Sequence, residues 1–258
     1  MSHLSIFVRR CVGLCTTLVA FAVLSLPAQA EELTVSAAAS LREAFSEVGK
    51  AFEASRPGTK VIFNFAASGP LLQQIAQGAP VDVFASADQE TMDRAAAQGL
   101  IAKDTRVTFA SNALVLVVPA SAARTPGSLK DLATDVYKRI AVGNPATVPA
   151  GRYAREAADA AGVSKALKDK LIFGDNVRQV LTYVGRAEVD AGFVYRTDAM
   201  IDRGRVRIVL EVPTKKLVNY PIVQILASKQ AGLSREFIAF VTAPPAQSIL
   251  ARYGFQKL

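Results

Sequence analysis

The sequence predicts an α/β protein whose mixed, mainly parallel sheets are flanked by helices. The chain of 258 residues is 51% hydrophobic and 20% charged, a globular composition with room for one or two sizeable cores. Short strand-like runs alternate with stretches of helical periodicity, which is typical of βα units. Strongly apolar strands at 114–119 and 222–226 are placed to act as crossovers. One domain stays possible, and the two-lobe alternative assigns 31–112 plus 222–258 to one lobe and 113–221 to the other.

Helix boundaries in the first part of the chain are marked by residues that start or stop helices. Ser40 precedes apolar residues at helical spacing, Pro70 suits a first helical position, and Asp88 is placed as a cap. Gly78 and Gly99 follow the two later helices. The predicted elements are a strand at 33–38, a helix from 41, a strand at 61–65, a helix at 70–77, a strand at 81–85 and a helix between Asp88 and Gly99.

The later part of the chain alternates in the same way. Ser128 and Asp175 are expected to cap helices, and Pro149 is expected to open one. The predicted elements are strands at 114–119 and 140–142, helices after Ser128, from Pro149 to Gly162 and at 177–186, strands at 192–195, 206–212 and 222–226, and helices on either side of Pro244-Pro245.

The first thirty residues are typical of a secretory signal peptide. Arg9 and Arg10 precede an apolar stretch at 11–26, and Pro27-Ala28-Gln29-Ala30 forms a small-residue cleavage pattern. A transmembrane anchor is the alternative, but the stretch is shorter than the ~20 residues that span a bilayer. We therefore expect residues 1–30 to be removed after Ala30 and the protein to be exported to the periplasm.

Composition excludes several kinds of chemistry after residue 30. The single His and both Cys lie in the leader, at His3, Cys11 and Cys15. The remaining chain has neither imidazole nor thiol, which excludes Ser-His-Asp and Cys-His catalysis and thiolate metal sites. With no imidazole to titrate, binding of a ligand is expected to vary little between about pH 6 and 8. The basic residues are dispersed, so the sequence favours a partner other than nucleic acid.

Four junctions between predicted strands and helices carry small or hydroxyl residues, at 37–40, 65–70, 143–151 and 174–177. Ligands bind at the carboxyl ends of parallel strands, and helix N-termini attract anions. The alternative for each serine at these junctions is an ordinary helix cap. Tyr195 ends a strand and is either a core residue or a phenol donor at a cleft. Arg178 either neutralises an anion from behind the site or is a solvated helix residue.

These junctions together resemble the periplasmic molybdate-binding proteins that serve ABC importers (the ModA family). The resemblance covers 33–257 and implies a two-lobed type II binding-protein fold with the ligand in the cleft between the lobes. It implies that Ser40, Ser68 and Tyr195 bind an oxyanion with their hydroxyls, while Ala150 and Val177 bind it with their backbone amides. The residues that carry it are Ala37-Ala38-Ala39-Ser40-Leu41, Ala67-Ser68-Gly69, Gly78-Ala79-Pro80-Val81-Asp82-Val83-Phe84-Ala85-Ser86-Ala87-Asp88, Ala141-Val142-Gly143-Asn144-Pro145, Val148-Pro149-Ala150-Gly151, Asn176-Val177-Arg178, Gly192-Phe193-Val194-Tyr195 and Arg252-Tyr253-Gly254-Phe255.

The resemblance implies a monomeric, non-enzymatic binding protein that captures molybdate, and tungstate as well, and delivers it to a membrane permease. It implies no cofactor and no metal cation, because the metal arrives as an oxyanion. Some family members carry more hydroxyls after the second serine, where this chain has Gly69-Pro70. The alternatives are a binding protein for another oxyanion, such as sulfate or thiosulfate, the effector lobe of a transcriptional regulator, and a secreted enzyme.

Overall fold

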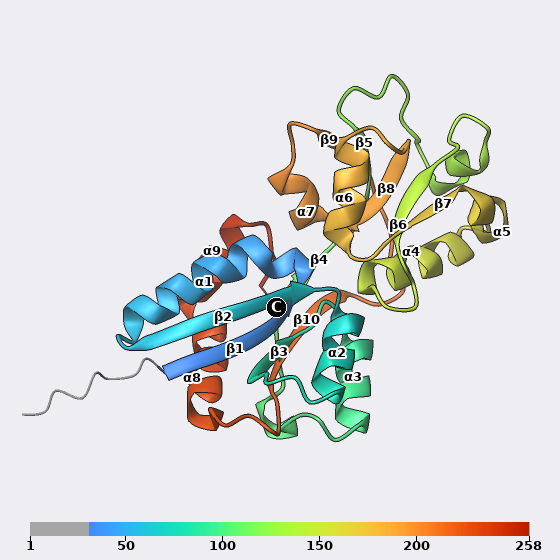
Figure 1. Ribbon diagram of the computed structural model, residues 1–258. Helices are drawn as coiled ribbons and strands as arrows, with labels where there is room; N and C mark the ends of the chain where they lie inside the picture. Colours follow the sequence, from blue (N-terminus) through green and yellow to red (C-terminus); the bar gives the residue numbers. More distant parts are fainter. Residues whose placement is uncertain (1–30, 258) are drawn as a thin grey trace, which may run out of the picture. The chain divides into compact units, whose positions relative to one another are not determined.

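The computed structural model describes residues 31–257, in which the strands form two five-stranded sheets (Figure 1). The predicted signal peptide lies outside the described residues. Both sheets are mixed and flanked by helices, so the predicted α/β fold is confirmed. Within 31–257, no helix is both long enough and apolar enough to cross a membrane.

The first sheet has the strand order β2-β1-β3-β10-β4. β1 runs parallel to β2 and β3, whereas β10 is antiparallel to both β3 and β4. Helices α1, α8 and α9 lie on one side of this sheet, and α2 and α3 lie on the other (Figure 1). The elements are β1 (Glu31–Ala38), η1 (Ala39–Leu41), α1 (Arg42–Ser55), β2 (Thr59–Ala66), α2 (Ser68–Ala76), β3 (Val83–Ala85), α3 (Gln89–Ala97), η2 (Lys103–Thr105), β4 (Val107–Asn112), β10 (Val218–Gln224), α8 (Ala231–Thr242) and α9 (Pro244–Arg252).

The second sheet has the order β7-β6-β8-β5-β9. β6 runs parallel to β7 and β8, and β5 is antiparallel to β8 and β9. The elements are β5 (Leu114–Pro119), η3 (Leu129–Ala133), β6 (Ile140–Gly143), α4 (Pro149–Ala160), α5 (Ser164–Leu167), η4 (Lys168–Lys170), β7 (Leu171–Gly174), α6 (Val177–Gly185), β8 (Ala191–Tyr195), α7 (Arg196–Ile201) and β9 (Val206–Glu211).

The chain passes between the sheets twice, from β4 to β5 and from β9 to β10. We call the first sheet with its helices the first lobe, and the second sheet with its helices the second lobe. The return to the first lobe comes earlier than the boundary at 222 that the sequence suggested, because Val218–Tyr220 already pair with β4. A register shift between Tyr220 and Pro221 accommodates the proline within the strand.

Aromatic packing holds α1 and α8 to the first sheet. The Phe45 and Phe52 rings of α1 meet the Phe237 ring of α8 edge to face, with centroids 6.4 and 5.2 Å apart. Phe45 also contacts Phe63 of β2 and Phe109 of β4. Such pairs contribute beyond their buried area and fix ring orientation. The packing holds α1 on the sheet, directly after the η1 turn that contains Ser40.

Candidate functional site

Ser40 lies in η1, directly after β1, and is buried. Its hydroxyl is 3.0 Å from the Tyr220 hydroxyl of β10. It makes no capping bond to α1, which begins at Arg42 after Leu41. The cap alternative for Ser40 is therefore wrong, and its hydroxyl faces an aromatic partner on a distant strand.

Ser68 is the first residue of α2 and is fully buried. Its hydroxyl accepts a hydrogen bond from the Ala87 backbone N–H at 3.1 Å, so it does not cap its own helix. The helix starts two residues before Pro70, which was expected to open it. Gly69 N–H donates to the Thr147 carbonyl of the second lobe at 3.0 Å. A Cβ at Gly69 would lie 2.5 Å from that oxygen, so glycine permits this close approach.

Ala150 and Val177 lie in the first turns of α4 and α6 and are both buried. First-turn amides have no acceptor within their own helix and point outward from its end. The α6 cap is Asn176, not the predicted Asp175, because the Asn176 side chain reaches the N–H groups of Arg178 and Gln179. This cap serves the second and third amides of the helix.

Tyr195 ends β8 with its side chain fully buried, and its hydroxyl has no hydrogen-bond partner among residues 31–257. Its ring lies 5.9 Å from the Tyr220 ring, so Tyr220 touches both Tyr195 and Ser40. Burial raises the pKa of Tyr195 well above 10. A buried hydroxyl that stays protonated and unpaired is costly unless a ligand accepts from it.

Two arginines of the second lobe form ion pairs with carboxylates of the first lobe. Arg152 of α4 donates from Nε and Nη2 to Asp88 Oδ2, at 3.1 and 2.5 Å, and both residues are buried. Its Nη2 also donates to Thr91 Oγ1 at 2.7 Å. Asp88 caps α3 as predicted, through the Thr91 N–H. The pair therefore joins α4 of the second lobe to the start of α3 in the first.

Arg178 of α6 is the second crossing arginine, and the solvated alternative is wrong because its side chain is only 18% exposed. It pairs with Glu43 of α1 at 2.5 Å and with Asp198 of α7 at 2.7 Å. Asp198 is fully buried, and burial raises its pKa to about 6, opposed by the neighbouring Arg178. The positive charge of Arg178 thus lies next to two carboxylates, those of Glu43 and Asp198.

Short chains of contacts connect the predicted ligand residues. Ser40 and Tyr195 share Tyr220, Ser40 O is 3.4 Å from Arg178 Nη2 next to Val177, and Gly69 joins Ser68 to the loop before Ala150. Their role as ligands remains a prediction. Sequence reasoning missed Tyr220, Asp198 and the Asp88–Arg152 pair, since each depends on partners far away in the chain.

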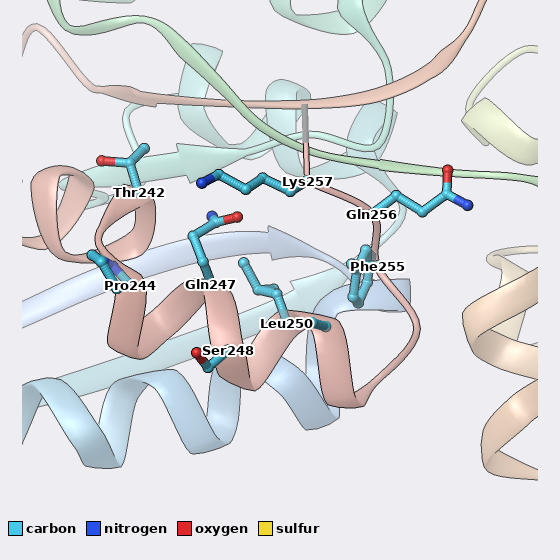
Figure 2. Close-up of a pocket in the computed structure, with 9 residues that line it drawn as sticks. Thr242, Pro244, Gln247, Ser248, Leu250, Phe255, Gln256 and Lys257 are labelled. Atoms are coloured by element: carbon cyan, nitrogen blue, oxygen red, sulfur yellow. The ribbon is translucent and has the colours of Figure 1, made fainter.

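Other hollows of the described chain lie apart from these residues. One of about 320 Å³ is lined by α9 and the segment after it, with Gln247, Leu250 and Phe255 around it (Figure 2). Another, of about 780 Å³, is lined by residues that include Asp82 and Leu226. None of the five predicted ligand residues lines either cavity. Within 31–257, no three His, Cys, Asp or Glu side chains group as a metal site.

Comparison with known proteins gives consistent matches over nearly the whole chain. A family model described as bacterial extracellular solute-binding protein matches residues 33–256. The molybdate-binding protein ModA of Haemophilus influenzae is 36% identical over 235 residues, 88% of this chain and 91% of that protein.

Two solved structures share the fold. The periplasmic molybdate-binding protein of Azotobacter vinelandii aligns with a TM-score of 0.74 at 21% identity, over 86% of this chain and 98% of its own. The sulfate-binding protein SubI of Mycobacterium tuberculosis aligns with a TM-score of 0.77 at 20% identity, over 88% of this chain and 87% of its own.

Proposed function

The chain belongs to the bacterial extracellular solute-binding protein family, and we propose that it captures molybdate, and tungstate as well, for an ABC importer. Membership indicates a solute-binding protein that works outside the cytoplasm, and we propose that it is not an enzyme. We further propose that it is exported with cleavage after Ala30, acts as a monomer in the periplasm, needs no cofactor, binds no nucleic acid, and delivers its ligand to a membrane permease.

The observation that carries the proposal is the buried, unpaired hydroxyl of Tyr195 close to the Ser40–Tyr220 pair. Molybdate is a tetrahedral dianion that has four acceptor oxygens and no proton to donate at neutral pH. Its partners must therefore all be donors. The hydroxyls of Ser40, Ser68 and Tyr195 and the amides of Ala150 and Val177 can each donate one hydrogen bond to it, and charge-assisted bonds of this kind each contribute about 1.5–3 kcal/mol.

The absence of a carboxylate among the five proposed ligands also bears on selectivity among anions. Hydrogen phosphate carries an O–H that needs an acceptor, and none of these five residues offers a charged one. Molybdate and tungstate have nearly the same size, so one cage holds both. Sulfate has the same charge and shape, and cavity size alone separates it from molybdate.

The second candidate is a binding protein for sulfate or thiosulfate. The likeness to SubI supports it at the level of the fold, at 20% identity. The molybdate proposal is preferred because the Haemophilus relative is 36% identical and is named for molybdate. A secreted enzyme has less support, since the chain after residue 30 contains neither His nor Cys.

Isothermal titration calorimetry on the chain from Glu31 onward tests the proposal. We expect molybdate and tungstate to bind with a sub-micromolar Kd, on the order of −8 kcal/mol or tighter, and sulfate, thiosulfate and phosphate to bind far more weakly. Sulfate binding as tight as molybdate binding would overturn the assignment.

A double serine variant and a matched control test whether the proposed residues bind the ligand. Ser40→Ala together with Ser68→Ala should abolish molybdate binding, because two buried donors are lost. Ser46→Ala is the control, since among residues 31–257 the Ser46 hydroxyl bonds only to the Arg42 carbonyl of its own helix. Retained binding in the double variant would contradict the proposed ligands even if the wild-type protein binds molybdate.

A further inference from the structure

The Arg178 side chain contacts acceptors in both lobes. Its Nε lies 2.7 Å from Asp198 Oδ1. Its Nη1 and Nη2 donate to the two Glu43 oxygens at 3.0 and 2.5 Å, and Nη2 is 3.4 Å from the Ser40 carbonyl. Each of the three nitrogens of one planar guanidinium thus lies close to an oxygen of a neighbouring residue, an arrangement that lysine cannot reproduce.

The acceptors of the Arg178 side chain lie in both lobes. Asp198 in α7 and Arg178 in α6 both belong to the second lobe. Glu43 and Ser40 belong to the first lobe. Asp198 Oδ2 also accepts the Tyr195 backbone N–H at 3.1 Å. The guanidinium therefore connects the backbone of Ser40, the start of α6 next to Val177, and, through Asp198, the backbone of Tyr195.

The charges show that Arg178 does not serve as a counter-ion for the ligand. One guanidinium faces two carboxylates, so the cluster carries a net negative charge when both are ionised. Asp198 is fully buried and Glu43 is about one-third exposed, so the guanidinium is committed to both rather than to solvent. A cluster of this sign would not attract a dianion, but it can hold two lobes in register.

We propose that Arg178 is a positioning residue of the oxyanion site: held by Asp198, it latches Glu43 and thereby fixes Ser40 against Val177 and Tyr195 while the ligand is bound. The proposal rests on the proposed function, because it concerns the same site. The latch must open before the ligand leaves, so it slows dissociation. Without ligand the open and latched forms exchange, and association starts from the open form, so loss of the latch affects the association rate less than the dissociation rate.

Glu43→Gln against Glu47→Gln is the decisive pair of variants. Both glutamates lie on α1, but Glu47 bonds to Arg252 and Tyr253 within the first lobe. Residues 31–258 contain no cysteine, so Gln77→Cys in the first lobe and Lys165→Cys in the second accept a donor–acceptor dye pair selectively. Stopped-flow energy transfer on this labelled protein then reports molybdate association and dissociation.

We expect Glu43→Gln to accelerate molybdate dissociation about tenfold and to leave the association rate within about twofold, since one charge-assisted contact is lost. Arg178→Lys keeps the charge but loses the paired geometry, so it should accelerate dissociation as well. Glu47→Gln should leave both rates within about twofold. Dissociation as slow in Glu43→Gln or in Arg178→Lys as in Glu47→Gln overturns the proposal.

A second readout does not depend on the ligand. In the ligand-free labelled protein, Glu43→Gln should lengthen or broaden the distribution of distances between the labels, and Glu47→Gln should not. Unchanged distances in Glu43→Gln overturn the latch. Absence of calorimetric heat with every oxyanion would instead overturn the proposed function, and the distance measurement would still test the latch.

Discussion

At the scale of single residues, Asp198 has a property that composition could not reveal. The absence of His after residue 30 predicted that ligand binding varies little between about pH 6 and 8. Burial, however, raises the pKa of Asp198 to about 6, even though Arg178 and the Tyr195 N–H stabilise its charged form. Glu43 beyond Arg178 also raises it. One carboxyl therefore titrates at the lower edge of that window.

This pKa predicts how stability depends on pH. Asp198 takes up a proton near pH 6 when folded but only near 3.8 when unfolded. The folded state thus binds more protons between these values, and the free energy of unfolding rises as pH falls through 6. We expect a gain of about 1 kcal/mol between pH 7 and pH 5 in urea unfolding followed by circular dichroism.

Asp198→Asn is the control for this prediction, because the amide does not titrate. Its free energy of unfolding should not show the rise between pH 7 and pH 5. A wild-type protein that loses stability over this range, or a variant that gains as much as the wild type, would contradict the assignment to Asp198.

At the scale of elements, the starts of α2 and α4 are placed by glycines that permit close backbone contact. A Cβ on Gly151 would lie 1.9 Å from the Gly143 carbonyl oxygen at the end of β6. That distance is far below any real contact, so an added methyl must displace the first turn of α4. The Ala150 amide lies in this turn and would move with it.

Gly151→Ala should therefore lower the free energy of unfolding by about 1–3 kcal/mol, as overpacking does, and should weaken molybdate binding. Gly232→Ala is the matched control, because Gly232 lies in the first turn of α8 with nothing within 4 Å of its added Cβ. That control should gain up to about 1 kcal/mol. Urea unfolding and calorimetry measure both effects, and equal behaviour of the two variants would refute the packing argument.

At the scale of the whole molecule, the Arg152–Asp88 pair joins the two lobes through buried charge. Arg152 and Asp88 are 5% and 4% exposed. Removing one partner of such a pair leaves an uncompensated buried charge, which costs more than the intact pair contributes. The contact between the lobes is thus sensitive to a single substitution.

Arg152→Met keeps much of the side-chain volume but leaves the Asp88 carboxylate unpaired. We expect it to lower the free energy of unfolding by about 3–5 kcal/mol. Arg155→Met, at an exposed position of the same helix, should change it by less than about 0.5 kcal/mol. Thermal or urea unfolding compares the two, and a small effect at Arg152 would show that solvent reaches Asp88.

The sequence by itself determined the α/β class and the positions of three of the five predicted ligand residues. Alternating periods and residue types at strand–helix junctions are local properties, so Ala150 and Val177 lie at helix starts and Tyr195 at a strand end, as the pattern predicted. Ser68 lies inside the first turn of α2, which begins earlier than expected, and Ser40 lies in η1. The sequence also predicted Asp88 as a cap and Pro149 as a helix start. The alternative that Ser40 and Ser68 cap helices was wrong, because the local sequence does not determine which distant group each hydroxyl contacts.

Only the tertiary structure decided what these residues touch. Ser40 meets Tyr220 across 180 residues, and Arg178 meets Glu43 across 135. Sheet order, the bulge at Pro221 and the two crossings between lobes create those contacts, and none follows from a local pattern. Burial, which raises the pKa of Asp198 and leaves the Tyr195 hydroxyl unpaired, likewise exists only once distant segments pack together.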